Sequence, residues 1–173
     1  MEREGILVRQ RLDSDVIQAA AGLVRVHARD GYPVEGVGRP EEWLTPRGMI
    51  NAWVAVKSGT VIGHVTVSRP ADEPAVSLWV ERSGESASSV AVLARLFVVP
   101  EARNVAAGEG LVRAAVDYAR GEGIRLVLDV LAKDAAAIRL YTRLGWKSIG
   151  SAVHAYGVRQ EAEAFCFVAP SVE

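Results

Sequence analysis

The chain has 173 residues, half of them hydrophobic, which suits one compact domain over residues 1–173 with its own core. Its formal net charge is −1, so the charge indicates neither a nucleic-acid partner nor an anionic membrane surface. One cysteine cannot form an internal disulfide, and no apolar leader or membrane-spanning stretch is present. We therefore expect a cytoplasmic protein.

The apolar patterns and turn signals predict an alternation of strands and helices. In chain order they are a strand over 5–12, a helix over 13–30, a short helical piece at 41–44, strands over 51–56, 61–68 and 91–99, a helix over 106–120, a strand over 124–131, a helix from 134 to 144, and strands over 146–153 and 161–168. Residues 69–89 are interpreted as a polar excursion with a strand extension at 76–80. This order predicts a mixed α/β sheet of about seven strands with about four helices and a right-handed strand-helix-strand crossover.

The turn before the helix at 106–120 is the strongest candidate for a binding site. The first amides of a helix have no internal partners and carry the positive end of its dipole, so they attract anions. Small residues at Ala106, Ala107, Gly108 and Gly110 would let a phosphate approach the backbone closely. Small residues alone would equally suit an Ala-rich helix that packs tightly on a sheet.

Two sequence blocks resemble the GNAT superfamily of N-acetyltransferases. Arg103-x-x-Ala106-x-Gly108 resembles its acyl-CoA motif R/Q-x-x-G/A-x-G/A, with a strand ending at Pro100 before it. The block from Asp134 to Trp146, which contains Ile138-Arg139-Leu140-Tyr141 and Gly145-Trp146, resembles the family pattern N-x-x-A-I-x-L-Y-x-x-x-G-F. The resemblance is specific over about 93–146. It implies a single, mostly antiparallel GNAT-like sheet flanked by helices.

The resemblance also implies acetyl-CoA as the acyl donor. The amides from Asn104 to Glu109 would hold its pyrophosphate, and main-chain groups of the strand before them would pair with pantetheine and the acetyl carbonyl. The implied cofactor-binding residues are Leu96, Phe97, Val98, Arg103, Asn104, Val105, Ala106, Ala107, Gly108, Glu109 and Asp134. Asn104 replaces a common Gly, and Asp134 replaces a common Asn that can contact the cofactor.

Tyr141 and Asp129 are the candidate catalytic residues. The resemblance places the Tyr141 phenol near the CoA sulfur, where it would protonate the leaving thiolate. Asp129 lies in an otherwise apolar strand and is the candidate base for the amine proton. Tyr141 could instead fill the core, and Asp129 could instead bond neighbouring backbone or face a solvated gap in the sheet. Water or a residue of the N-terminal half could then serve as the base.

The predicted reaction is direct acetyl transfer to a primary amine in a ternary complex. The alternative is a catalytically silent module that binds acyl-CoA. His27, His64 and His154 are scattered without metal-ligand spacing, so no metal site is expected. The acceptor, a small molecule or a peptide, and the oligomeric state, a homodimer included, are left open.

Overall fold

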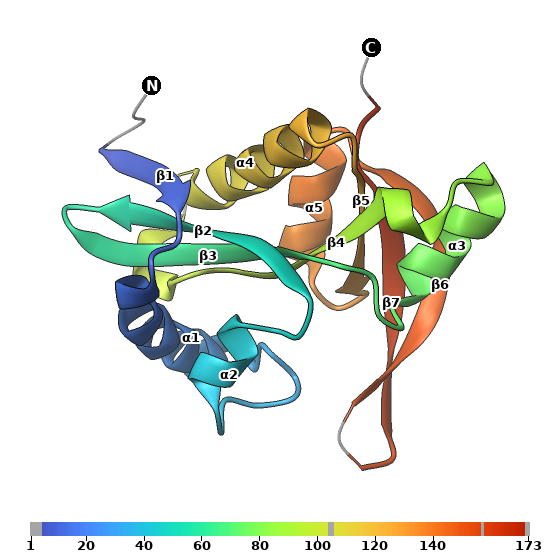
Figure 1. The fold of residues 1–173 in the computed structure, drawn as a ribbon. Coiled ribbons are helices and arrows are strands. Elements are labelled where there is room, and N and C mark those ends of the chain that lie inside the picture. Colours follow the sequence, from blue (N-terminus) through green and yellow to red (C-terminus); the bar gives the residue numbers. More distant parts are fainter. Residues whose placement is uncertain (1–4, 104–105, 157, 172–173) are drawn as a thin grey trace. The chain divides into compact units, whose positions relative to one another are not determined.

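The computed structural model describes residues 5–103, 106–156 and 158–171 (Figure 1). Within these residues, seven strands form one mixed and mostly antiparallel sheet with the order β1-β2-β3-β4-β5-β7-β6. The chain divides into two compact units: unit 1 takes Met1–Ser68 and Arg95–Ala115, and unit 2 takes Arg69–Ala94 and Val116–Glu173. Strand β4 and helix α4 contribute residues to both units.

Unit 1 combines three antiparallel strands and the end of a fourth strand with two helices and the start of a third helix. Its elements are β1 (Ile6–Gln10), α1 (Val16–Asp30), α2 (Pro40–Leu44), β2 (Met49–Lys57), β3 (Thr60–Ser68), the end of β4 (Val90–Val98) and the start of α4 (Ala107–Gly121). A hairpin turn joins β2 to β3, with left-handed backbone at Ser58 (φ 51°) and Gly59 (φ 76°). Helix α1 ends as predicted, at Gly31 with φ 72°.

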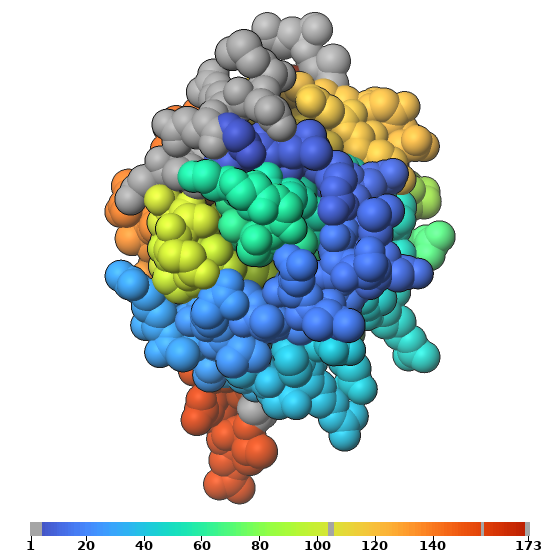
Figure 2. Space-filling view, turned by 90° about the vertical axis from the view of Figure 1, so that its left-hand side faces the viewer, coloured from blue at the N-terminus to red at the C-terminus, as the bar shows by residue number. Residues whose placement is uncertain are grey.

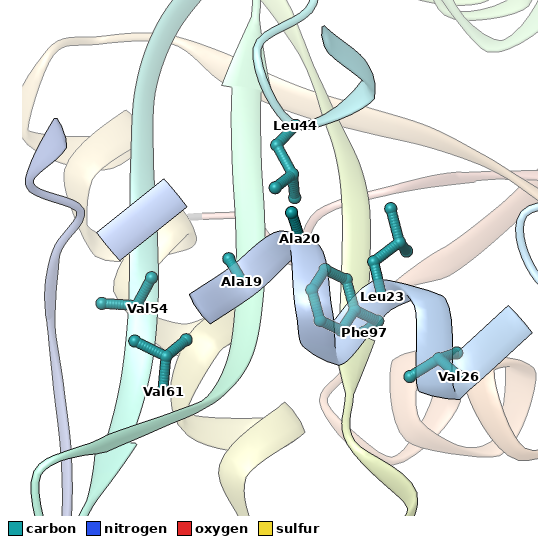
Figure 3. Close-up of a cluster of buried hydrophobic side chains, with 8 residues drawn as sticks. All are labelled: Ala19, Ala20, Leu23, Val26, Leu44, Val54, Val61 and Phe97. Atoms are coloured by element: carbon teal, nitrogen blue, oxygen red, sulfur yellow. The ribbon is translucent and has the colours of Figure 1, made fainter. Parts of the chain in front are cut away.

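Helix α1 provides one side of the unit 1 core. Ala19, Ala20, Leu23 and Val26 follow helical spacing and pack with buried side chains from α2, β2, β3 and β4 (Figure 3). Phe97 enters this cluster from β4. In Figure 2 the blue α1 and the light-blue to cyan segment after it lie at the surface, beside the green hairpin.

Unit 2 combines the remaining strands with α3, α5 and the end of α4. Its elements are the start of β4, α3 (Pro74–Ser83), the end of α4, β5 (Arg125–Leu131), α5 (Ala135–Arg143), β6 (Lys147–Tyr156) and β7 (Gln160–Val168). Strand β5 runs parallel to β4, which a connection through α4 permits, and antiparallel to β7. Its core contains Val92, Val127 and Cys166, packed with Val76 of α3.

Residues 76–80 form part of a helix and not the predicted strand extension. Pro74 is the first residue of α3, where its missing N–H has no cost, and Gly84 ends the helix with φ 73°. Ala75 and Val76 are buried, while the following apolar residues are partly covered. With α3, the described residues contain five α-helices, one more than the sequence patterns predicted. None of the helices in the described ranges is long and apolar enough to cross a membrane.

Candidate functional site

The end of β4 presents its backbone beside β3 in unit 1. The Phe97 side chain is buried in the α1 core, and the Val99 amide donates to the Ile62 carbonyl at 2.9 Å. A Cβ on Gly63 would lie 3.1 Å from the Phe97 carbonyl oxygen and 2.9 Å from a methyl group of Leu111. Glycine at position 63 therefore permits β3 to approach both β4 and α4 closely.

Arg103, the first residue of the predicted acyl-CoA motif, uses its side chain within unit 1. Its guanidinium donates to the Val98 carbonyl, with Nη2 at 3.2 Å, and pairs with the Asp30 carboxylate at the end of α1. The side chain thus connects the end of β4 with α1. The next two predicted binding residues, Asn104 and Val105, lie outside the described residues.

Helix α4 begins where the motif places small residues. Ala106 adopts a left-handed backbone conformation with φ 63°, and Ala107 is the first helical residue. The first helical hydrogen bond runs from the Gly110 amide to the Ala106 carbonyl, at 3.1 Å. The amides of Ala107 and Gly108 precede that ladder and lie at the positive end of the helix dipole. The Glu109 side chain pairs with Arg113 one turn later.

His64 forms a network in unit 1 that the sequence analysis missed. The side chain is fully buried and stacks on Phe97, with ring centroids 5.6 Å apart. Arg11 Nη1 lies 2.9 Å from His64 Nε2, and because arginine only donates, Nε2 must accept. Nδ1 then carries the proton and donates to the Arg95 carbonyl at 3.0 Å. Burial, with the Arg11 and Arg95 charges, lowers the pKa of His64 to about 4.

Arg95 occupies an unusual position within β4. Its backbone is left-handed, with φ 60°, and its guanidinium lies 4.7 Å from the ring centroid of Trp43. A left-handed non-glycine residue costs of order 1–2 kcal/mol, and such residues are uncommon inside a strand. The sequence signal that could have drawn attention to it is a charged residue inside an otherwise apolar run from Val90 to Val99.

Tyr141, the candidate acid, lies in unit 2 with 5% of its surface exposed. Its ring packs against Trp146 and Phe167, at centroid distances of 5.6 and 6.3 Å. Burial and then the nearby Asp134 carboxylate raise the pKa of the phenol. Tyr141 and Asp134, both from the second predicted block, are thus brought close enough to interact.

Asp129, the candidate base, is held by protein groups of unit 2. Its Oδ1 accepts from the Ala75 amide at 3.1 Å and from Cys166 Sγ at 3.2 Å. Ala75 is the second residue of α3, and Cys166 is the register partner of Asp129 in β7. Burial raises the pKa of the carboxyl group, although both hydrogen bonds oppose this effect. Asp129 therefore forms the hydrogen bond to backbone that was the alternative to a catalytic role, and the Ala75 amide is its partner.

The candidate residues fall into two sets. The described cofactor-binding residues from Leu96 to Glu109 belong to unit 1, whereas Asp129, Asp134 and Tyr141 belong to unit 2. Across the described ranges, no three His, Cys, Asp or Glu side chains are grouped so that they could hold a metal ion.

The comparisons with known proteins identify the family. The model of the Acetyltransferase (GNAT) family matches residues 20–146. The fold is similar to an N-acetyltransferase from Staphylococcus aureus Mu50, with a TM-score of 0.71 and 15% identity over 95% of this chain and 98% of that one. It is also similar to Arabidopsis thaliana NAA60 in complex with acetyl-CoA, with a TM-score of 0.70 and 21% identity over 94% and 97% of the two chains.

A third similar structure is the Salmonella typhimurium acetyltransferase yncA with its cofactor acetyl-CoA, with a TM-score of 0.71 and 15% identity over 96% and 94% of the two chains. No significant match to a curated protein was found. The family model covers well over half of the chain, and the matched part includes β4, the start of α4 and α5. The chain therefore belongs to the GNAT family of acetyltransferases.

Proposed function

We propose that this protein transfers an acetyl group from acetyl-CoA to a primary amine by direct attack, and that residues 1–173 act as one acetyltransferase domain. The observation that carries this proposal is the start of α4, where the left-handed Ala106 leads into helical amides that precede the ladder. Small side chains there suit a cradle for the pyrophosphate, and this is the segment that matches the acyl-CoA motif. Two similar structures, from Arabidopsis and Salmonella, were solved with acetyl-CoA.

The residues of the cradle bind through their backbone. We assign the pyrophosphate to the amides from Asn104 to Glu109, and the pantetheine and acetyl carbonyl to main-chain groups of Leu96 to Val98. The Val98 carbonyl already accepts from Arg103, so Arg103 supports the shape of the turn as well as its charge. Asp134 adds a carboxylate to unit 2, where it interacts with Tyr141.

We assign the general acid to Tyr141. The thioester of acetyl-CoA supplies an activated acyl group, and its sulfur needs a proton as it leaves. The raised pKa keeps the Tyr141 phenol protonated over the physiological pH range, so its hydroxyl group has a proton to donate. The same shift makes it a weaker acid than an exposed tyrosine.

We assign the acceptance of the amine proton to Asp129, either directly or through one water. An alkylammonium group with a pKa near ~10.4 must lose a proton before it attacks, and a carboxylate of raised pKa is a better base than an exposed one. The bonds that Oδ1 accepts from Ala75 and Cys166 would hold the carboxyl group in one orientation.

A binding and turnover experiment tests the proposed function. We expect acetyl-CoA to bind in calorimetry, and free CoA thiol to be released only when a primary amine is added. Replacing Gly108 by Trp should abolish binding by filling the cradle. Gly121→Trp is the matched control at the other end of α4, because the space around that position is open and binding should persist. Unchanged affinity in a folded Gly108→Trp variant would exclude this site.

The alternative function is a silent module that binds acyl-CoA without turnover. It predicts normal acetyl-CoA binding with no amine-dependent thiol release from any acceptor in a panel of small amines and peptides. Mass spectrometry of the panel would identify the acetylated acceptor if the enzyme is active.

A further inference from the structure

Arg11 and Arg95 are two arginines of unit 1 that form no ion pair within 4 Å of a described carboxylate. In the described residues, five arginines pair with carboxylates: Arg9, Arg25, Arg39, Arg103 and Arg113. A guanidinium is charged at every physiological pH. Asp13 and Asp15 partly offset the charge of Arg11, whereas no carboxylate oxygen of a described residue lies within 4 Å of Arg95.

The two guanidinium groups are held at the same short segment. Arg11 donates to the Leu44 carbonyl at 2.6 Å and to Thr45 Oγ1 at 2.9 Å, while Arg95 stacks on Trp43. These contacts lie on three consecutive residues at the end of α2. The acceptors are all neutral, as is the His64 ring that Arg11 also contacts. Both charges act on His64 and help to lower its pKa.

A second stacked arginine shows what is unusual about Arg95. Arg125 of unit 2 lies 4.9 Å from the Trp79 ring centroid, close to the corresponding distance for Arg95. Arg125 directs its Nε and Nη2 donors to the Ala169 carbonyl, at 3.2 and 2.9 Å. In contrast, the Arg95 side chain forms no hydrogen bond with another described residue. Its planar fork of donors matches a carboxylate in geometry and charge.

The backbone of Arg95 is fixed next to the segment assigned to the acyl donor. Its carbonyl accepts from His64 Nδ1, and its left-handed conformation lies within β4, directly before Leu96. Stacking on Trp43 limits the motion of the guanidinium, so less conformational entropy is lost when it binds an anion.

We propose that Arg95, supported by Arg11, binds the carboxylate of the acceptor, and that the acceptors are therefore free amino acids. This inference rests on the proposed acetyl transfer and adds the substrate class. The carboxylate would supply the negative charge that Arg95 lacks among the described residues, and Arg95 would hold it by paired N–H···O hydrogen bonds.

Paired acceptors test the proposal. L-alanine, L-methionine and L-leucine are each compared with their α-carboxamide, which keeps the amine and removes the negative charge. We expect wild type to prefer the free acid, and Arg95→Gln to lower kcat/KM for the acid by roughly 10- to 100-fold. The carboxamide should change less than threefold, and the Kd for acetyl-CoA should not change. Calorimetry of the same six compounds, with CoA present, gives a second measurement that does not need turnover.

Arg125→Gln is the matched control, because it removes a stacked arginine whose donors are used within the protein. It should lower the melting temperature and leave the ratio of acid to carboxamide unchanged. Equal losses on acid and carboxamide, weaker acetyl-CoA binding in Arg95→Gln, or no binding of any of the three amino acids to wild type would overturn the inference. Failure of the proposed function is distinct, since wild type would then not bind acetyl-CoA or would release no thiol with any amine.

Discussion

His64 in unit 1 and Asp129 in unit 2 are both titratable side chains on strands, but their hydrogen bonds differ. His64 is fully buried, and each ring nitrogen has a protein partner, Arg11 on one side and the Arg95 carbonyl on the other. Asp129 is partly exposed, and the bonds from Ala75 and Cys166 both converge on Oδ1. A proton on His64 would break an existing bond, whereas a proton on Asp129 could be carried by the other oxygen.

This difference separates a group that stabilises the fold from a group that can exchange protons. His64 has no ring nitrogen left for a substrate, so its low pKa reports burial and not catalysis. Asp129 and Tyr141 in unit 2 have raised pKa values and are the groups to which we assign proton transfer. Substitution of Asp129 or Tyr141 should therefore act on turnover, and substitution of His64 should act on stability.

Tyr141→Phe should have the largest effect. The ring remains to pack against Trp146 and Phe167, so the fold and the acetyl-CoA affinity should be kept. Loss of the hydroxyl should lower kcat by roughly 10²- to 10⁴-fold, the range for a missing general acid. Steady-state kinetics and calorimetry on one preparation separate the two quantities. Tyr118→Phe in α4 is the control, and a wild-type kcat in Tyr141→Phe would make Tyr141 a core residue only.

His64→Gln should change the pH dependence of stability. The folded-state pKa of about 4 lies below the ordinary 6.5, so the unfolded chain binds more protons between these values. The stability contributed by neutral His64 is complete above pH 6.5 and is lost as the pH falls to 4, by about 3 kcal/mol in total. Urea unfolding at pH 7.5 and 4.5 should show that Gln removes this part of the slope. The same slope in both proteins would contradict a buried neutral histidine.

Asp129→Asn should lower kcat/KM by roughly 10²-fold, at the low end for a lost general base. The acidic limb of the pH profile should disappear, because a raised carboxyl pKa sets that limb in wild type. The raised pKa also means that the ionised group is disfavoured in the fold, so stability falls as the pH rises through it. Asn keeps an oxygen for Ala75 and Cys166, so the melting temperature at pH 7 should hold or rise.

The opposite pattern would mean that Asp129, like His64, stabilises the fold and does not take part in catalysis. A lower melting temperature with an intact acidic limb would mean that the carboxylate mainly supports the start of α3. Water would then be the better candidate for the proton acceptor.

The strands and four of the helices were predictable because their signals are local. Gly59 predicts the turn between β2 and β3, and the long apolar run at 124–131 predicts β5. Helix α3 was missed because its apolar residues are consecutive and resemble a short strand. Pro74 at its start and Gly84 at its end were the signals that could have identified it.

The two units also differ in how much of the candidate site was predictable. The turn before α4 follows from a contiguous motif, and the Asp134–Tyr141 pair lies within one block. The network around His64 joins residues from β3, β4, α2 and the segment after β1, and these are far apart in the chain. No local spacing predicts such contacts.

Ala106 belongs to the acyl-CoA motif and has a left-handed backbone conformation. Ala106→Gly should have the smallest effect of the four substitutions. Alanine at φ 63° has a steric cost of order 1–2 kcal/mol, which glycine removes. Glycine also raises the entropy of the unfolded chain, by roughly 0.5–1 kcal/mol. The net gain in the free energy of unfolding should therefore be about 0.5–1 kcal/mol, with acetyl-CoA affinity within about twofold because the cradle keeps its amides.

Ala114→Gly in the interior of α4 is the matched control, since its backbone is helical. The same change of residue should there lower the free energy of unfolding by about 1 kcal/mol. Urea unfolding of both variants measures the two signs directly. If Ala106→Gly also destabilised the protein, Ala106 would not have a left-handed conformation in solution. The proposed backbone cradle before α4 would then lack its supporting observation.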